Sequence, residues 1–591
     1  MIKKIFPLLI VGLFVLNGFH AASIQNDESM NNHLSVSFSF SEPTIDIQDS
    51  YVHVELPEST SSLMQVNNPS LPLVSKTFRF PFKTTLKQLT VTFSQSEKQI
   101  IPGLIKPASS PAYISTEFSI PEPKIIPNPE IYDSYQTFPE KQYWYRLGTG
   151  LYEEKLTTFV TVFISPMQYL PADDTIILWK EAHIDLEVDI PQNPVMLPDE
   201  YDLLILTPAE FSDELGPLVE EKQAHEIKTN LVSLEDIPEQ GIDIQESIKY
   251  FIKDAIEEWG ISSVLLVGGG LEGKEQFPVR YAWVPSGNYE KKFPSDLYYA
   301  DVYDANGNFS SWDNNSNGKY AEFPDDNVSV DLYPDVSIGR LPCETAEEVT
   351  TVVNKIIRYM TKNKMTNHIV QMGGDTFPGD PHGVNEGEYA NTQVMEQLPT
   401  YTTTQLWGSE GNLRRFNIIW ETWKGADFLD FSGHGSYLSW ATHPPQDDKQ
   451  WLPDGRFYTG FVYIDTEWLI NFWKLPVVVL NACSCSKFSE SKNCLGWSFV
   501  KNEIGGGIAS YGASGIGYGS YGTSETDRLF GWMEVHLLKK LGMQKTLGQT
   551  WNECLVEYIN SFELEEVDYK TIYEMTLIGD PSLAITNGSE V

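Results

Sequence analysis

Apolar and polar side chains alternate with a period of two in several early parts of the chain. The runs 34–40, 52–56 and 184–190 place an apolar residue at every second position. Successive side chains of a strand point to opposite faces, so this alternation predicts strands with one buried face. The proline-rich stretch 107–139 predicts an extended, exposed crossing segment. We therefore expect an all-β N-terminal region.

From about residue 202 the pattern changes to strands that alternate with helices. A continuous apolar run at 203–206 is typical of a parallel strand buried on both faces. Apolar residues at helical spacing follow between 244 and 259, and Gly260 is placed to end that helix. Thr345 and Glu348 form a capping-box pattern before another helix. Further buried strands are predicted at 264–267, 368–372, 428–432, 477–480 and 508–511.

These patterns predict the fold class and the domain organisation. Strands separated by helices indicate an α/β region with a mainly parallel sheet, in which ligands bind beyond the carboxyl ends of the strands. We expect a β-rich domain at 23–197 that ends in a proline-bounded linker. Two α/β subdomains should follow, at 198–365 and 366–591, with the second carrying the chemistry.

The first 22 residues have the features of a secretory signal. Lys3 and Lys4 form a basic start, 5–16 is apolar, and Ala21 and Ala22 are small residues before a cleavage point. The apolar run is shorter than the roughly 20 residues that span a bilayer. We expect the segment 1–22 to be removed, leaving a secreted protein with no membrane association.

Charge and cysteine count narrow the function classes. The 591 residues include 81 Asp and Glu against 41 Lys and Arg, a formal charge of −40. Such a chain is repelled by phosphate backbones and anionic lipids, so no nucleic-acid partner is expected. Five cysteines cannot all pair with one another, which leaves at least one thiol available for chemistry.

Two strand ends carry residues suited to nucleophilic catalysis. His434 stands between two glycines just after the run 428–432, and Cys483 closely follows the run 477–480. A cysteine needs a thiolate to be a good nucleophile, and a neighbouring imidazole can take its proton. The backbone N–H groups of Gly435 and Cys483 would then be placed to bind an oxyanion. The pattern favours a Cys–His dyad for acyl transfer.

The residues alone leave a structural interpretation open. A cysteine at a strand end is commonly a small buried apolar residue, and a Gly-His-Gly sequence can be a simple turn. Cys485 lies two residues beyond Cys483 and competes for the same role.

Four motifs in order resemble those of the gingipain family of cysteine peptidases, within the caspase-like clan. They are Gly433-His434-Gly435-Ser436 with Trp440-Ala441, Ala482-Cys483 with Phe488, Ile338-Gly339-Arg340-Leu341-Pro342, and Ile578-Gly579-Asp580-Pro581-Ser582-Leu583. The resemblance covers about residues 200–586, and the N-terminal domain resembles the family propeptide more loosely. It implies a caspase-like fold.

The resemblance also implies roles for single residues. Cys483 would be the nucleophile and His434 the general base and acid. The family's acidic residue that orients the histidine would fall near Asp375. An acidic residue that selects basic substrates would correspond to Glu386 or Glu388, although an ordinary acidic loop is an equal alternative in so acidic a chain.

The resemblance extends to the pocket and to the mode of activation. The glycine-rich stretch 505–519 resembles the strand and loop that line the primary pocket. The N-terminal domain would act as an intramolecular inhibitor until the linker around 191–200 is cut. The implied protein is a secreted cysteine endopeptidase, made as a zymogen, that acts on proteins or peptides and needs no cofactor for its chemistry.

One loop has the spacing of a calcium ligand set. Asp313, Asn315 and Asn317 supply oxygens at positions one, three and five, and Gly318 stands at position six. Position twelve is Pro324 where a bidentate glutamate is usual, so a polar surface turn is the alternative. A structural Ca²⁺ is the metal we expect if the loop binds one, and zinc is not expected.

Two other function classes remain as alternatives. A secreted binding or adhesion protein could use an inactive peptidase fold, although both Cys483 and His434 are present. A carbohydrate hydrolase is indicated only by the 13% aromatic residues and abundant carboxylates.

Overall fold

The computed structural model describes residues 32–48, 50–117, 126–327, 330–380, 383–455 and 458–586. The predicted signal at 1–22 lies outside these residues. Within the described ranges no helix has the length and the apolar character needed to cross a membrane.

The N-terminal region is built from strands, as predicted. One sheet pairs β11 with β1, β6 and β10, and a second has the order β4-β5-β9-β8. In the first, Leu34 lies opposite Leu186, and alternate residues of β11 face a shared apolar core. The elements are β1 (His33–Ser39), β2 (Thr44–Gln48), β3 (Tyr51–Glu55), β4 (Ser61–Leu63), β5 (Leu71–Pro81), β6 (Thr85–Ile100), β7 (Ala112–Tyr113), α1 (Pro129–Tyr132), β8 (Tyr143–Tyr152), β9 (Lys155–Ile164), β10 (Met167–Leu170) and β11 (Thr175–Asp189).

The main sheet of the remaining chain has ten strands, in the order β13-β12-β14-β17-β27-β25-β24-β20-β18-β19. Every neighbouring pair is parallel except β25 and β27. The predicted α/β region with a mainly parallel sheet is therefore confirmed, and the antiparallel pair divides the sheet into two parallel halves. The strands are β12 (Leu203–Thr207), β13 (Thr229–Ser233), β14 (Ser263–Val267), β17 (Ser337–Leu341), β18 (His368–Gly373), β19 (Thr402–Trp407), β20 (Phe428–Ser432), β24 (Val477–Asn481), β25 (Ala509–Ala513) and β27 (Met575–Ile578).

The helices connect and cover these strands. The predicted helix α3 ends at Gly260, where φ is +78° and a β-carbon would lie 1.7 Å from the carbonyl oxygen of Pro198. Only glycine fits that position. Thr345 caps α5 by accepting a hydrogen bond from the N–H of Glu348. The α-helices of this region are α2 (Ser212–Ala224), α3 (Ile244–Trp259), α4 (Leu297–Ala300), α5 (Ala346–Lys362), α6 (Glu386–Gln397), α7 (Arg415–Lys424), α8 (Leu495–Lys501), α9 (Leu529–Leu541), α10 (Leu547–Ser561) and α11 (Glu566–Glu574).

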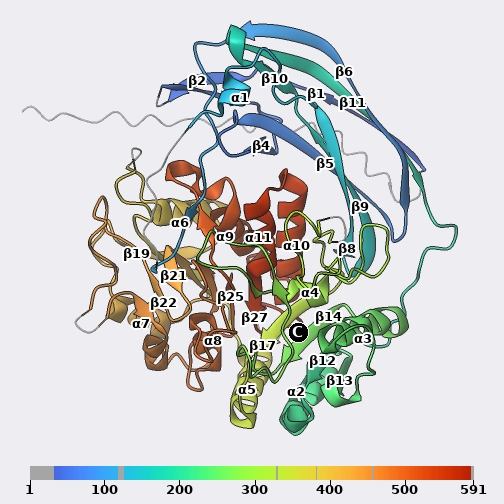
Figure 1. The fold of residues 1–591 in the computed structure, drawn as a ribbon. Helices are drawn as coiled ribbons and strands as arrows, with labels where there is room; N and C mark the ends of the chain where they lie inside the picture. Colours follow the sequence, from blue (N-terminus) through green and yellow to red (C-terminus); the bar gives the residue numbers. More distant parts are fainter. Residues whose placement is uncertain are drawn as a thin grey trace, which may run out of the picture.

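The β-rich region stacks on one end of the α/β region, with β8 and β9 reaching towards α10 (Figure 1). Tyr333 stacks on Phe159 with ring centroids 5.0 Å apart, and the N–H of Thr149 donates to the buried carboxylate of Asp331 over 2.8 Å. Because both apolar and polar contacts cross the boundary between the β-rich and α/β regions, the two regions share a packed interface. Strand β11 ends at 189 and β12 begins at 203, but the domain boundaries at 197 and 365 stay predictions.

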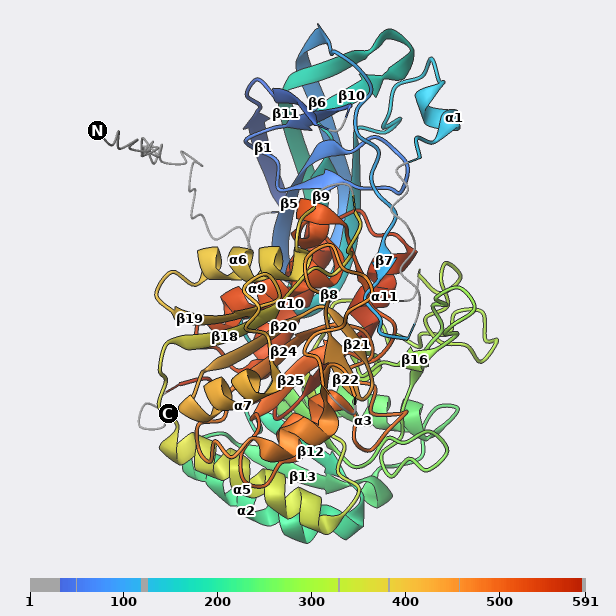
Figure 2. The same ribbon diagram turned by 90° about the vertical axis from the view of Figure 1, so that its left-hand side faces the viewer.

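The crossing segment is described at 107–117 and 126–139. Its first part, 107–117, runs down from the β-rich region to the neighbourhood of β21 (His434–Ser436) and β22 (Ser439–Ala441), as Figure 2 shows. Its strand β7 pairs antiparallel with β26 (Tyr518–Gly519). The expected exposure is wrong for the central residues, because Ala112 and Ile114 are buried. This segment brings the N-terminal region into contact with the loops that follow β20 and β24.

Candidate active site

The topology brings His434 and Cys483 to the same edge of the sheet. Strands β20 and β24 are parallel neighbours whose last residues, Ser432 and Asn481, are in register. His434 begins β21, whose hairpin partner β22 places Ala441 opposite it and Trp440 opposite Gly435. This pairing explains the spacing between the histidine and the Trp-Ala pair in the sequence motif.

The His434 ring is held in a fully buried position. Its Nε2 lies 2.6 Å from the carbonyl oxygen of Thr376. A carbonyl oxygen only accepts, so Nε2 carries the ring proton in this arrangement and Nδ1 is the basic atom. The ring also packs edge-on against Phe377 and Trp451. Burial lowers the pKa of His434 to about 3, so the imidazole is neutral here.

The Cys483 thiol is also buried, and it donates to the carbonyl oxygen of Gly517 over 3.1 Å. Burial, with the nearby Glu574 and Glu290 carboxylates, raises the pKa of Cys483 well above its ordinary value. The thiol therefore stays protonated in this state. A reactive thiolate would need solvation or a closer cation.

A peptide of the N-terminal region occupies this site. The carbonyl oxygen of Ile114 accepts from the N–H of Gly435 over 3.0 Å and from the N–H of Cys483 over 3.1 Å. The N–H of Ile114 donates to Gly517, and that of Thr116 donates to Gly435. The two N–H groups named from the sequence as oxyanion donors thus converge on one carbonyl, beside the Cys483 thiol.

Asp375 follows β18 and lies near the site without a direct bond to His434. Its Oδ2 accepts from the backbone N–H of Gln446 over 2.7 Å. Burial raises the pKa of Asp375 to about 6. The atom that bonds to the histidine ring is the backbone carbonyl of the next residue, Thr376. Sequence reasoning missed this contact because any residue type can supply a carbonyl.

Glu386 and Glu388 lie at the start of α6, and both accept hydrogen bonds from backbone N–H groups of neighbouring loops. Glu386 is buried and accepts from the N–H groups of Thr376, Phe377 and Gly522. Burial raises the pKa of Glu386 to about 8. Glu388 accepts from the backbone N–H and the hydroxyl of Ser409, over 2.8 and 2.7 Å. Glu386 therefore ties the loop that contacts His434 to the loop that begins at Gly522.

The glycine-rich stretch lines the position of the bound peptide. A β-carbon at Gly517 would lie 3.5 Å from Cδ1 of Ile114, and one at Gly519 would lie 3.1 Å from Cγ2 of Ile114. The same β-carbon at Gly519 would lie 2.8 Å from Oε2 of Glu525. The carboxylate beside Gly519 is therefore that of Glu525, a residue that the sequence analysis did not single out. No local sequence signal identifies Glu525 or Ile114.

The predicted calcium loop uses its oxygens on its own backbone. Asp313 accepts from the N–H groups of Asn317 and Gly318, and Asn315 accepts from that of Asn317. Asn317 in turn accepts from Lys319. This geometry fits the polar-turn alternative, and calcium binding stays a prediction.

Among the described residues, a different set of acidic side chains offers grouped ligand atoms. Oxygens of Asp375, Asp380 and Glu386 lie within 4.8 Å of one another.

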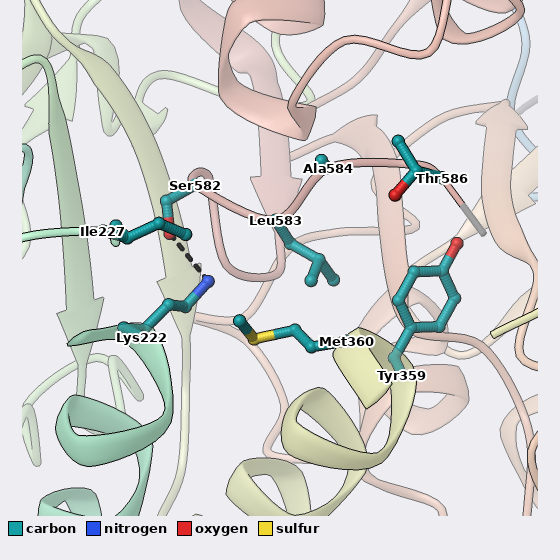
Figure 3. Close-up of a pocket in the computed structure, with 8 residues that line it drawn as sticks. All are labelled: Lys222, Ile227, Tyr359, Met360, Ser582, Leu583, Ala584 and Thr586. Carbon is teal, nitrogen blue, oxygen red and sulfur yellow. Dashed lines mark hydrogen bonds between the residues drawn. The ribbon is translucent and has the colours of Figure 1, made fainter. Parts of the chain in front are cut away.

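A separate pocket lies away from the loops that carry His434 and Cys483. Figure 3 shows it between the end of α2, the end of α5 and the segment after β27. Lys222 forms a fully buried ion pair with Asp580, with Nζ 2.6 Å from Oδ2, and also bonds to the hydroxyl of Ser582. This contact gives the Gly579-Asp580-Pro581 motif a structural role.

Comparison with known proteins places the chain in a family. No curated protein matches it. A solved complex of the RgpB pro- and mature domains from Porphyromonas gingivalis shares 17% identity and a TM-score of 0.45, over 65% of this chain and 79% of that one. The crystal structure of the Arg-specific cysteine proteinase gingipain R shares 17% identity and a TM-score of 0.47, over 67% and 80%. The model of peptidase family C25 matches residues 197–586, so this chain belongs to peptidase family C25.

Proposed function

We propose that this protein is a cysteine endopeptidase that is made in a latent form. The observation that carries the proposal is the position of the Ile114 carbonyl, which accepts from the N–H groups of Gly435 and Cys483. A scissile carbonyl must occupy such a position for its oxygen to be stabilised as an oxyanion. Membership of a cysteine peptidase family supports the same chemistry.

The proposed mechanism uses Cys483 and His434. Nδ1 of His434 takes the proton of the Cys483 thiol, and the sulfur attacks the scissile carbonyl carbon. The negative charge on the carbonyl oxygen is held by the N–H groups of Gly435 and Cys483. The protonated imidazole then gives its proton to the leaving amine, which breaks the peptide bond. A water molecule, deprotonated by His434, releases the acyl group and restores the thiol.

The groups around His434 would position its ring and would take no part in bond breaking. The Thr376 carbonyl bonds to Nε2 of His434 and sets the ring orientation and tautomer. Glu386 holds Thr376 by accepting from its N–H. Asp375, one residue earlier, would support the same loop through its bond to Gln446. The chemistry needs no cofactor, and a calcium ion at the Asp313 loop would have a structural role.

Latency would follow from the occupied site. The segment 112–116 fills the space that a substrate needs and keeps both the thiol and the imidazole away from water. Cutting the linker around 191–200 would let the N-terminal region leave. The basic and apolar features of residues 1–22 support export, so the substrates would be proteins or peptides outside the cell.

The test compares the peptidase activity of the protein spanning residues 23–591 with that of two single variants. Cys483→Ala removes the proposed nucleophile, whereas Cys485→Ala removes a thiol that is buried in an apolar cluster, 3.8 Å from the carbonyl oxygen of Ser439. After limited proteolysis, each would be assayed under reducing conditions with fluorogenic peptides. We expect cleavage by the parent and by Cys485→Ala, and none by Cys483→Ala.

Two outcomes would count against the proposal. Equal cleavage by the parent and Cys483→Ala would remove Cys483 from the mechanism. If no form of the protein cleaves any peptide, even after the linker has been cut, the result would favour a binding protein on an inactive peptidase fold.

A further inference from the structure

The side chain of Ile114 is buried between the glycine-rich stretch and α9. It is 1% exposed and belongs to the same apolar cluster as Phe530. Its Cγ2 and Cδ1 face the backbones of Gly519 and Gly517, and a β-carbon at Gly517 would lie 3.1 Å from the Phe530 ring. Two glycines and an aromatic ring therefore lie beside this side chain, and the Glu525 carboxyl borders it at Gly519.

The acidic groups near the pocket are occupied by other partners. Oε2 of Glu525 accepts from the N–H of Ser520 over 2.7 Å, and Oε1 lies 3.5 Å from the amide nitrogen of Asn481. Burial raises the pKa of Glu525 to about 8, so this carboxyl is uncharged at neutral pH. Glu386 uses both oxygens on backbone N–H groups. Neither carboxyl is poised to pair with an incoming cation.

We propose that the pocket formed by Gly517, Gly519 and Phe530 is the primary specificity pocket and that the protein cleaves after branched aliphatic residues. The inference rests on the proposed peptidase function, because it takes the Ile114 carbonyl to stand where the scissile carbonyl would stand. The residue that supplies that carbonyl is the one before the scissile bond, so its side chain reports on the pocket that a substrate must fill.

The physical reason is a difference in desolvation. An isoleucine or valine side chain gains free energy when its apolar surface leaves water. A lysine or arginine side chain in the same place would lose its hydration without a charged partner, unless Glu525 gave up its proton. We therefore expect discrimination on the order of tenfold or more against basic residues.

The first experiment measures substrate specificity and starts from the full chain. A recognition sequence for a site-specific protease replaces residues 192–196. After this linker has been cut, the protein is assayed with peptides that differ only in the residue before the scissile bond. We expect kcat/KM for Ile and Val to exceed that for Lys and Arg by on the order of tenfold. Faster cleavage after Lys or Arg would overturn the specificity and leave the peptidase function standing. Cleavage of none of the peptides would remove both.

The second experiment needs no catalytic activity. In the uncut chain, the rate of Cys483 alkylation by iodoacetamide reports how often the segment 112–116 leaves the site. Ile114→Val should keep the parent rate, and Ile114→Lys should raise it on the order of tenfold, because the ammonium group is poorly accommodated. A lower rate for Ile114→Lys than for the parent would mean that the pocket prefers a cation, and it would overturn the proposal.

Discussion

The backbone N–H of Cys483 donates a hydrogen bond to the carbonyl oxygen of Ile114 over 3.1 Å. The bond joins the residue with the candidate nucleophilic thiol to a peptide from the N-terminal region of the same chain. A substrate carbonyl would need that N–H, so the chain's own segment and a substrate compete for one position.

Gly435→Ala should lower kcat of the activated protein on the order of a hundredfold, because the added methyl group would move the Gly435 N–H away from the oxyanion. A β-carbon at Gly435 would lie 2.5 Å from the carbonyl oxygen of Cys483 and 2.7 Å from Sγ of Cys485, so the strand must shift. Steady-state kinetics measure the effect. Gly216→Ala, in α2, where the added carbon would meet no atom within 4 Å, is the control. Unchanged kcat in Gly435→Ala would contradict the expected displacement of this N–H from the oxyanion.

Ala112→Arg should expose the Cys483 thiol in the uncut chain. Ala112 is fully buried and pairs with Gly519, so a long charged side chain there would displace β7 from β26. The rate of iodoacetamide labelling at Cys483, followed by mass spectrometry, should rise on the order of tenfold or more. Ala172→Arg, at an exposed position of the same region, should leave the rate unchanged. Equal labelling in both variants would argue against occlusion by this segment.

Glu525→Gln should flatten the dependence of stability on pH. The pKa of Glu525 is about 8 in the folded protein and near 4.5 in an unfolded chain. Between these values the unfolded chain releases a proton that the folded protein keeps, so the contribution of Glu525 to stability is present below pH 4.5 and is lost as pH rises to 8.

The measurement is the thermal midpoint at pH 5 and at pH 8. Glutamine cannot ionise, so Glu525→Gln should lose less stability than the parent over this interval, by an amount on the order of a few kcal/mol. Glu503→Gln, at an exposed position, should follow the parent. Parallel curves for all three proteins would mean that Glu525 ionises normally in the fold.

Lys222→Met and Asp580→Asn should each destabilise the protein by on the order of 3–5 kcal/mol, because each leaves a buried group without its partner. The two side chains are fully buried and 2.6 Å apart. Urea denaturation of both single variants and the double variant measures their coupling. The double variant should be more stable than the sum of the single effects predicts. Strict additivity would show that the pair is not coupled.

Local pattern alone determined most of the secondary structure and the placement of two key residues. Alternation at 34–40 and 184–190 predicted β1 and β11, which pair in the fold. The buried runs before His434 and Cys483 predicted β20 and β24, and parallel strands that are neighbours end at one edge. Period and strand direction are local properties, so they can be read without knowing what packs against them.

The tertiary structure decided which backbone atoms meet those two side chains. Nothing local marks Ile114 as the residue that fills the site, because its position depends on how the β-rich region docks on the sheet. Glu386 looked available for a basic substrate, but backbone N–H groups of Thr376 and of Gly522, which is 136 residues away, occupy its oxygens. Hydrogen-bond partners and burial are set by long-range packing, and they decide whether a carboxylate binds a ligand or supports a loop.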